Sequence, residues 1–160
     1  MEQTGRRLRA RKDLHRYGSD ILESEELKQA YLQTHHRWST VGEHTLQVAV
    51  TSLLICYALK RVHINTSVED VVVGSLCHDL GILDRTVKYK NNRECGREHP
   101  IDSVKVAKHL VPDLTDRSKD IIERHMWPIG GKLPNSKEGV IVSIADKYCA
   151  VRDFVGGSHR

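Results

Sequence analysis

A histidine and an aspartate stand side by side within an otherwise apolar stretch, Leu76-Cys77-His78-Asp79-Leu80. Burying an imidazole beside a carboxylate costs free energy unless another group compensates both of them. A divalent cation is a suitable partner, because neutral imidazole and ionised carboxylate are both common metal ligands. We therefore predict a fold that surrounds this pair with further ligands.

Four further candidate ligands are distributed along the chain: His44, His99, His125 and Asp146. Nitrogen and carboxylate donors without thiolates suit Fe, Mn, Co, Ni, Zn or Mg and do not select among them. Six ligands exceed the needs of one catalytic ion, which keeps a coordination position open. The set therefore fits two ions that share a carboxylate, and it fits one ion if His99 and His125 are bystanders.

The spacing of apolar residues predicts an all-α fold. In residues 42–61, His44, Val48, Thr51 or Ser52, and Ile55 recur at intervals of three and four, which turns His44 inward on a helix. Other helices are expected at residues 24–31, 67–80, 100–112 and 116–125, with Pro100 in the first helical position and a polar loop at 84–98. Residues 139–154 would suit a buried strand by propensity, but their length and a stripe of apolar residues favour a helix. The stripe consists of Val140, Ile144, Tyr148 and Val151. The result is a compact single-domain bundle of about six helices.

The chain resembles the HD superfamily of metal-dependent phosphohydrolases over about residues 35–155. The resemblance rests on the segments Val41-Gly42-Glu43-His44-Thr45, His78-Asp79-Leu80-Gly81 and Ile144-Ala145-Asp146-Lys147. His99 and His125 look like the additional histidines of two-metal members. Small bacterial stand-alone HD proteins are the most similar branch. The resemblance implies that His44, His78, Asp79 and Asp146 hold one metal. It also implies that Asp79 bridges to a second metal held by His99 and His125.

The resemblance implies a hydrolase in which a metal-bound hydroxide attacks phosphorus in a nucleotide or another small phosphorylated molecule. The candidate catalytic residues are Asp79, Lys147 and Arg85. The candidate phosphate-binding residues are Arg85, Lys88, Arg124, Lys132 and Lys147. Glu43 and Asp84 are further candidates, which would orient a ligand imidazole. Two alternatives use the same ligands: a di-iron oxygenase, and a non-catalytic regulatory module that binds metal or nucleotide.

Residues 1–20 form a polar, arginine-rich segment, which we expect to be a basic arm in front of an HD domain at residues 21–160. A mobile or surface-bound arm is the favoured interpretation, and nucleic-acid binding is the weaker alternative. The net charge of +4 suits an anionic ligand. No apolar run reaches the roughly 20 residues of a membrane span, and no secretory signal is evident. We therefore expect a cytoplasmic protein, and both a monomer and an oligomer are compatible with the sequence.

Overall fold

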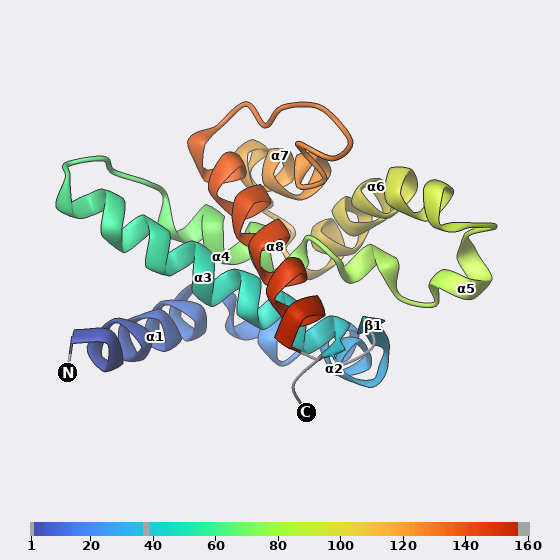
Figure 1. Cartoon of the computed structure of the whole chain (residues 1–160), viewed down its shortest axis with the longest axis horizontal. Coiled ribbons are helices and arrows are strands. Elements are labelled where there is room, and N and C mark those ends of the chain that lie inside the picture. The colour runs from blue at the N-terminus through green and yellow to red at the C-terminus, as the bar shows by residue number, and fades with distance from the viewer. Residues whose placement is uncertain (1, 37–38, 157–160) are drawn as a thin grey trace.

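A computed structural model describes residues 2–36 and 39–156 (Figure 1). The described chain forms eight α-helices, which confirms the all-α prediction, although the count exceeds the expected six. They are α1 (Glu2–Leu22), α2 (Glu25–Leu32), α3 (Val41–Arg61), α4 (Val68–Cys77), α5 (Arg85–Lys88), α6 (Asn92–Leu110), α7 (Asp116–Arg124) and α8 (Lys137–Gly156). A short 3-10 helix, η1 (Leu80–Ile82), follows α4, and β1 (Thr34–His36) pairs antiparallel with β2 (Ser39–Thr40).

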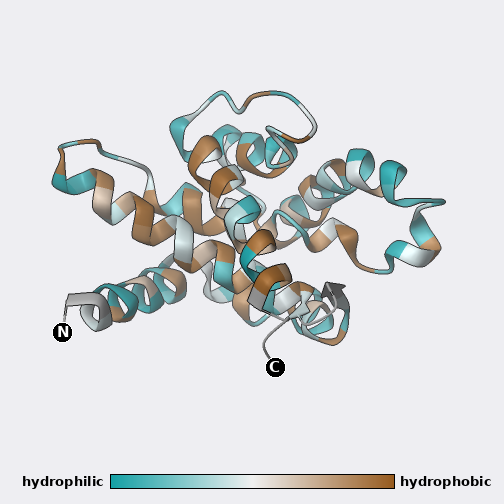
Figure 2. Ribbon diagram, in the orientation of Figure 1, coloured by the Kyte–Doolittle hydropathy of each residue, from teal (hydrophilic) through white to brown (hydrophobic). Residues whose placement is uncertain are grey.

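Helix α4 lies at the centre of the molecule and is buried from Asp70 to Cys77. Helices α1, α3, α7 and α8 all pack against it, and α3 and α8 also pack against each other. Apolar residues cover much of α3, whereas the surface of α1 is largely hydrophilic (Figure 2). A helix that is apolar nearly all round requires neighbours on every side, which explains the central position of α4. Among the described helices, none combines the length and the apolar character needed to cross a lipid bilayer.

The prediction of a polar loop at residues 84–98 was wrong, because α5 and the first part of α6 occupy it. Helix α6 begins at Asn92, so Pro100 lies inside the helix and not at its start. The Asn91 side chain accepts a hydrogen bond from the Glu94 N–H at 2.9 Å, and the Glu94 carboxylate accepts one from the Lys90 N–H at 2.6 Å. This capping allows the helix to begin at Asn92. The helix tolerates the loss of one backbone hydrogen bond at Pro100, which has no N–H to donate.

Two other segments differ from expectation. The arginine-rich N-terminal segment forms α1, which buries Ala10, Leu14 and Ile21 against the core and extends past residue 20. The apolar stripe at residues 139–154 correctly predicted the helix α8. The stripe faces outward, however, and its member Tyr148 is 58% exposed. The buried face of α8 instead contains Ile141, Val142, Ala145 and Cys149 together with the polar Asp146. The buried carboxylate of Asp146 interrupts the apolar pattern on the inner face, so the sequence pattern does not show which face of α8 is buried.

The side chain of Asp70, in the first turn of α4, ties α4 to α7. Its carboxylate accepts hydrogen bonds from the hydroxyls of Thr115 and Ser118 and from the guanidinium of Arg117. Burial alone would raise the pKa of this carboxyl, but these groups and the Ser67 hydroxyl together lower it. The carboxylate is therefore stabilised in its ionised form by the fold itself.

We expect Asp70→Ala to lower the free energy of unfolding by about 2–4 kcal/mol at neutral pH, because the buried Ser118 hydroxyl loses its acceptor. Urea titrations followed by circular dichroism measure the effect. Because folding depresses the pKa of Asp70, its contribution is complete above the unfolded value of about 3.9 and disappears as the pH falls through the lower folded value. Glu69→Ala changes an exposed neighbour and should shift stability by less than about 0.5 kcal/mol. Equal stability of Asp70→Ala and wild type at neutral pH would contradict this role.

Candidate metal centre

Helices α3, α4, α6, α7 and α8 approach one another at the middle of the molecule (Figure 1). The six candidate ligands come from these helices or directly follow them, and their side chains lie close together. His44 lies in the first turn of α3, His99 lies within α6 and Asp146 lies within α8. His78 and His125 are the C-cap residues of α4 and α7, and Asp79 directly follows α4. All six are buried, with Asp146 the most exposed at 7%. Such a concentration of buried polar groups requires compensation within the cluster.

Three of the histidines are oriented in the same way by the backbone. The Nδ1 atoms of His78, His99 and His125 each lie 2.7 Å from a carbonyl oxygen three or four residues earlier, those of Ser75, Cys95 and Ile122. A carbonyl can only accept, so Nδ1 carries the proton and donates it. In its neutral form each ring therefore presents an Nε2 lone pair to the cluster, and this is the form that binds a metal.

Asp79 lies between the imidazoles. Its Oδ1 atom is 3.3 Å from Nε2 of His99 and 3.4 Å from Nε2 of His125, and its Oδ2 atom is 3.5 Å from Nε2 of His78. The ligand atoms form two compact groups, His44 with His78 and Asp79, and Asp79 with His99 and His125. Asp79 belongs to both groups. A carboxylate shared in this way is suited to bridge two cations.

Asp146 completes the first group. Its Oδ1 atom lies 2.8 Å from Nε2 of His44 and 3.8 Å from Nε2 of His78. The rings of His44, His78, His125 and His99 form a continuous row, with neighbouring centroids 5.9, 5.0 and 5.0 Å apart. Four imidazoles and two carboxylates thus surround one small polar space.

The ring nitrogens of three of these histidines support the fit of the site to divalent cations. The Nε2 atoms of His99 and His125 face each other at 3.0 Å, although both rings carry their proton on Nδ1. Two lone pairs at this distance repel unless a proton or a metal cation lies between them. In addition, Nε2 of His78 is buried and makes no hydrogen bond within the described chain. Metal ions would satisfy these nitrogens together with the carboxylates.

The protonation states also suit metal binding. Burial lowers the pKa of His78 to about 4, so this imidazole is neutral at physiological pH. Burial alone would raise the pKa of Asp79, but the imidazoles of His78, His125 and His99 lower it well below its usual value. The same balance lowers the pKa of Asp146, for which His44 supplies the largest opposing contribution. Burial alone would lower the pKa of His44 and of His99, but the carboxylates of Asp146 and Asp79 outweigh it and raise the pKa of both imidazoles. A metal cation beside these carboxylates would replace the added protons, because neutral histidine and ionised aspartate are the forms that coordinate a metal.

The cluster opens into a cavity of about 450 Å³. Asp79, His99, His125 and Asp146 form part of its wall, and Arg85 and Lys147 are the basic residues that line it. Lys147 donates hydrogen bonds through Nζ to Asp146 Oδ2 at 2.5 Å and to the His125 carbonyl at 2.9 Å. Arg85 donates to the Asn92 side chain at 2.9 Å. Positive charge therefore lies beside the ligands at the mouth of the cluster.

The other three candidate phosphate-binding residues do not line this cavity. Arg124 forms an ion pair with Asp120 at 3.0 Å and donates a hydrogen bond to the Leu133 carbonyl. It therefore connects α7 to the loop that follows it. Lys88 reaches the Gly81 carbonyl at 3.4 Å, and Lys132 is exposed. The two residues that line the cavity, Arg85 and Lys147, are also the two that closely follow a ligand motif in the sequence.

Neither carboxylate expected to orient a ligand imidazole contacts one. Glu43 is exposed and closes a capping box with Thr40 at the start of α3. Asp84 is also exposed, in a left-handed backbone conformation. The side chain that sequence reasoning missed is Asp153, whose Oδ2 atom lies 3.6 Å from Nδ1 of His44. Asp153 lies seven residues after Asp146, which places both on one face of α8. This spacing is the sequence feature that could have identified Asp153 as a neighbour of the ligands.

Gly81 allows the His78-Asp79 segment to approach α6. A Cβ atom at this position would lie 2.3 Å from the Ser103 nitrogen and 2.4 Å from the His99 carbonyl oxygen. The Gly81 N–H also donates to the Ser103 hydroxyl at 2.9 Å. Only glycine permits this backbone contact, which brings Asp79 within reach of His99.

A profile of the HD domain family matches residues 41–151. No curated protein and no solved structure matches the chain. The matched region covers more than half of the chain and includes all six candidate ligands. Members of this family generally are metal-dependent hydrolases, and some are non-catalytic. The chain belongs to the HD domain family.

Proposed function

We propose that this protein is a metal-dependent phosphohydrolase that cleaves a phosphoester or phosphoanhydride bond in a nucleotide or another small phosphorylated molecule. The observation that carries the proposal is the cluster of six buried ligands, in which His99 and His125 face each other at 3.0 Å beside the shared carboxylate of Asp79. The cluster opens to a cavity with basic side chains, as phosphate recognition requires.

In this proposal His44, His78, Asp79 and Asp146 hold one divalent ion, and Asp79, His99 and His125 hold a second. Bound divalent ions supply a water that is acidic enough to act as a nucleophile at neutral pH, together with positive charge for a phosphoryl group. The protein's own backbone carbonyls keep three of the imidazoles in the required tautomer. No side chain needs to be phosphorylated.

The remainder of the cavity suits the substrate. Lys147 and Arg85 place cationic groups where phosphate oxygens would lie, and Lys147 also holds Asp146 in position. Ile82, Met126 and Ile129 provide apolar wall on which the non-phosphate part of the molecule can pack. A cavity of about 450 Å³ is within the usual range for small-molecule sites.

The test is a screen of the chelator-stripped protein, reloaded separately with Fe(II), Mn, Co, Ni, Zn or Mg under anaerobic conditions. Nitrophenyl phosphate esters and a panel of nucleotides serve as substrates, and phosphate release is measured. We expect hydrolysis that requires metal and proceeds without O₂. Turnover only in the presence of O₂ would instead support a di-iron oxygenase. Binding of metal and nucleotide without turnover under any condition would support a regulatory module.

Lys147→Ala is expected to lower kcat by about 10–100-fold, because Asp146 loses its hydrogen-bonded partner and the cavity loses a positive charge. Steady-state kinetics with the best substrate from the screen measures the effect. Lys132→Ala, which removes an exposed lysine outside the cavity, is the matched control and should keep wild-type rates. Equal kinetics for the two variants would exclude Lys147 from the site.

A further inference from the structure

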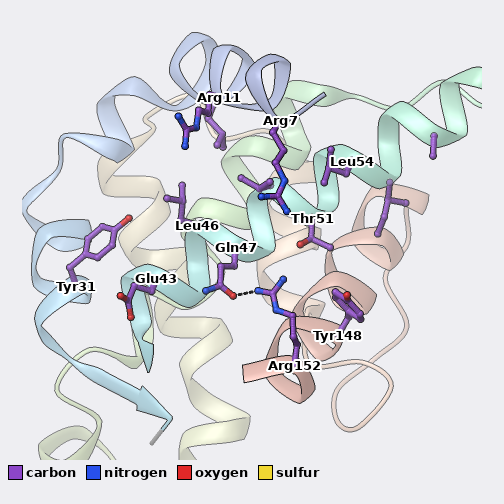
Figure 3. A pocket seen from close by; sticks show the side chains of 14 residues that line it. Arg7, Arg11, Tyr31, Glu43, Leu46, Gln47, Thr51, Leu54, Tyr148 and Arg152 are labelled. Atoms are coloured by element: carbon purple, nitrogen blue, oxygen red, sulfur yellow. Dashed lines mark hydrogen bonds between the residues drawn. The ribbon is translucent and has the colours of Figure 1, made fainter. Parts of the chain in front are cut away.

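A second and larger cavity, of about 800 Å³, lies between α1, α3 and the C-terminal part of α8 (Figure 3). It shares no lining residue with the cavity at the candidate metal centre. Helix α3 separates the two, because His44 faces inward while Leu46, Gln47 and Val50 face this groove. Nothing in the proposed phosphohydrolase function uses it.

The floor of the groove is an apolar row on α3. Leu46, Val50, Leu54 and Ala58 recur every four residues and therefore follow one ridge, inclined to the helix axis, that rises about 18 Å at 1.5 Å per residue. The three larger members are only partly buried. A floor of this length matches an extended hydrocarbon chain, which buries apolar area along its whole length.

The rims of the groove are cationic. Arg7 and Arg11, one helical turn apart, extend from α1 over the floor, and Arg152 reaches in from α8 to donate a hydrogen bond to Gln47 (Figure 3). Within the described residues neither Arg7 nor Arg11 forms an ion pair with an acidic side chain. Glu43 is the single acidic residue in the lining, and its carboxylate accepts a hydrogen bond from the Thr40 N–H. Guanidinium groups favour carboxylate and phosphate oxygens through paired hydrogen bonds.

We propose that this groove is a second binding site, which takes a single-chain amphiphile with an anionic head group. The hydrocarbon chain lies along the row from Leu46 to Ala58. The head group is held by the guanidinium groups of Arg7 and Arg11. The site is separate from the metal centre, because the two cavities share no lining side chain.

Isothermal titration calorimetry with decyl phosphate, below its critical micelle concentration, tests the proposal. We expect saturable binding of one molecule per chain. Ethyl phosphate lacks the chain and decyltrimethylammonium reverses the charge, so both should bind at least about ten-fold more weakly. Comparable binding of decyltrimethylammonium would show unspecific hydrophobic adsorption and would overturn the proposal.

Charge-reversing variants locate the site. Arg7→Glu combined with Arg11→Glu should weaken decyl phosphate binding at least ten-fold, whereas Lys12→Glu should leave it within about two-fold. Lys12 is an exposed cation on the same helix that does not line the groove, so the control has the same kind of charge change. Asp79→Asn should also bind normally. Loss of binding in Asp79→Asn alone would place the anion at the metal centre and contradict a second site.

A further outcome would assign the groove to protein association. If sedimentation velocity shows a dimer that the double arginine variant dissociates and decyl phosphate does not, a second copy of the chain covers the groove. That result would overturn the amphiphile proposal. A monomer at all concentrations, together with decyl phosphate binding that depends on Arg7 and Arg11, would support it.

Discussion

Replacing Asp79 with asparagine is expected to lower metal-dependent phosphate release by at least about a thousand-fold, which corresponds to about 4 kcal/mol of transition-state stabilisation. Asparagine keeps the shape of the side chain but removes the negative charge that lies between His78, His99 and His125. A neutral amide is a poor bridge between two cations. Metal content, measured by inductively coupled plasma mass spectrometry, should fall from about two ions per chain to one or fewer.

Asp84→Asn is the matched control for this substitution. Asp84 lies five residues later and is exposed, and asparagine tolerates its left-handed backbone conformation as well as aspartate does. This variant should keep wild-type activity and metal content. If Asp79→Asn also kept both, the central role of the shared carboxylate would be refuted.

His99→Ala should separate the two-ion arrangement from the one-ion arrangement. Only the second group of ligands contains His99, so we expect the loss of one bound ion while His44, His78 and Asp146 keep the other. Phosphate release should fall by about a hundred-fold or more, because one of two cationic charges is missing. Metal analysis and kinetics on the same samples give both quantities, and circular dichroism verifies that the variant is folded.

His109→Ala removes an exposed histidine from the same helix and serves as the comparison. It should bind the wild-type amount of metal and hydrolyse substrate at the wild-type rate. Unchanged metal content in His99→Ala would mean that His99 and His125 are bystanders. The centre would then hold a single ion.

The helical class and the ligand candidates were predictable because both depend on local patterns. Apolar residues at intervals of three and four specify a helix wherever its neighbours are placed, as in α3. The start of α6 was missed for a local reason as well. Asn91 and Glu94 provide a cap that is also local, but Pro100 is the residue more commonly found at a helix start, so the sequence pattern places the start of α6 too late.

Other features depend on which segments approach one another. The orientation of α8 was not evident, because its inner face combines Asp146 with apolar residues while its outer face exposes Tyr148. Arg85 and Lys147 each closely follow a ligand motif in the sequence, but only the position of the cavity excludes Lys88, Arg124 and Lys132 from its lining. The contact of Asp153 with His44 joins α8 to α3 across more than a hundred residues.

The sequence by itself thus determined which side chains were available as metal ligands and that most of them would lie on helices, because residue chemistry and helical periodicity are local properties. The tertiary structure decided how closely the ligands approach one another around Asp79, and that Lys88, Arg124 and Lys132 do not line the cavity beside them. It also decided that a cationic groove forms on the opposite side of α3. These features require side chains from different helices to come within a few ångströms of each other, and such distances are set by packing of the whole core.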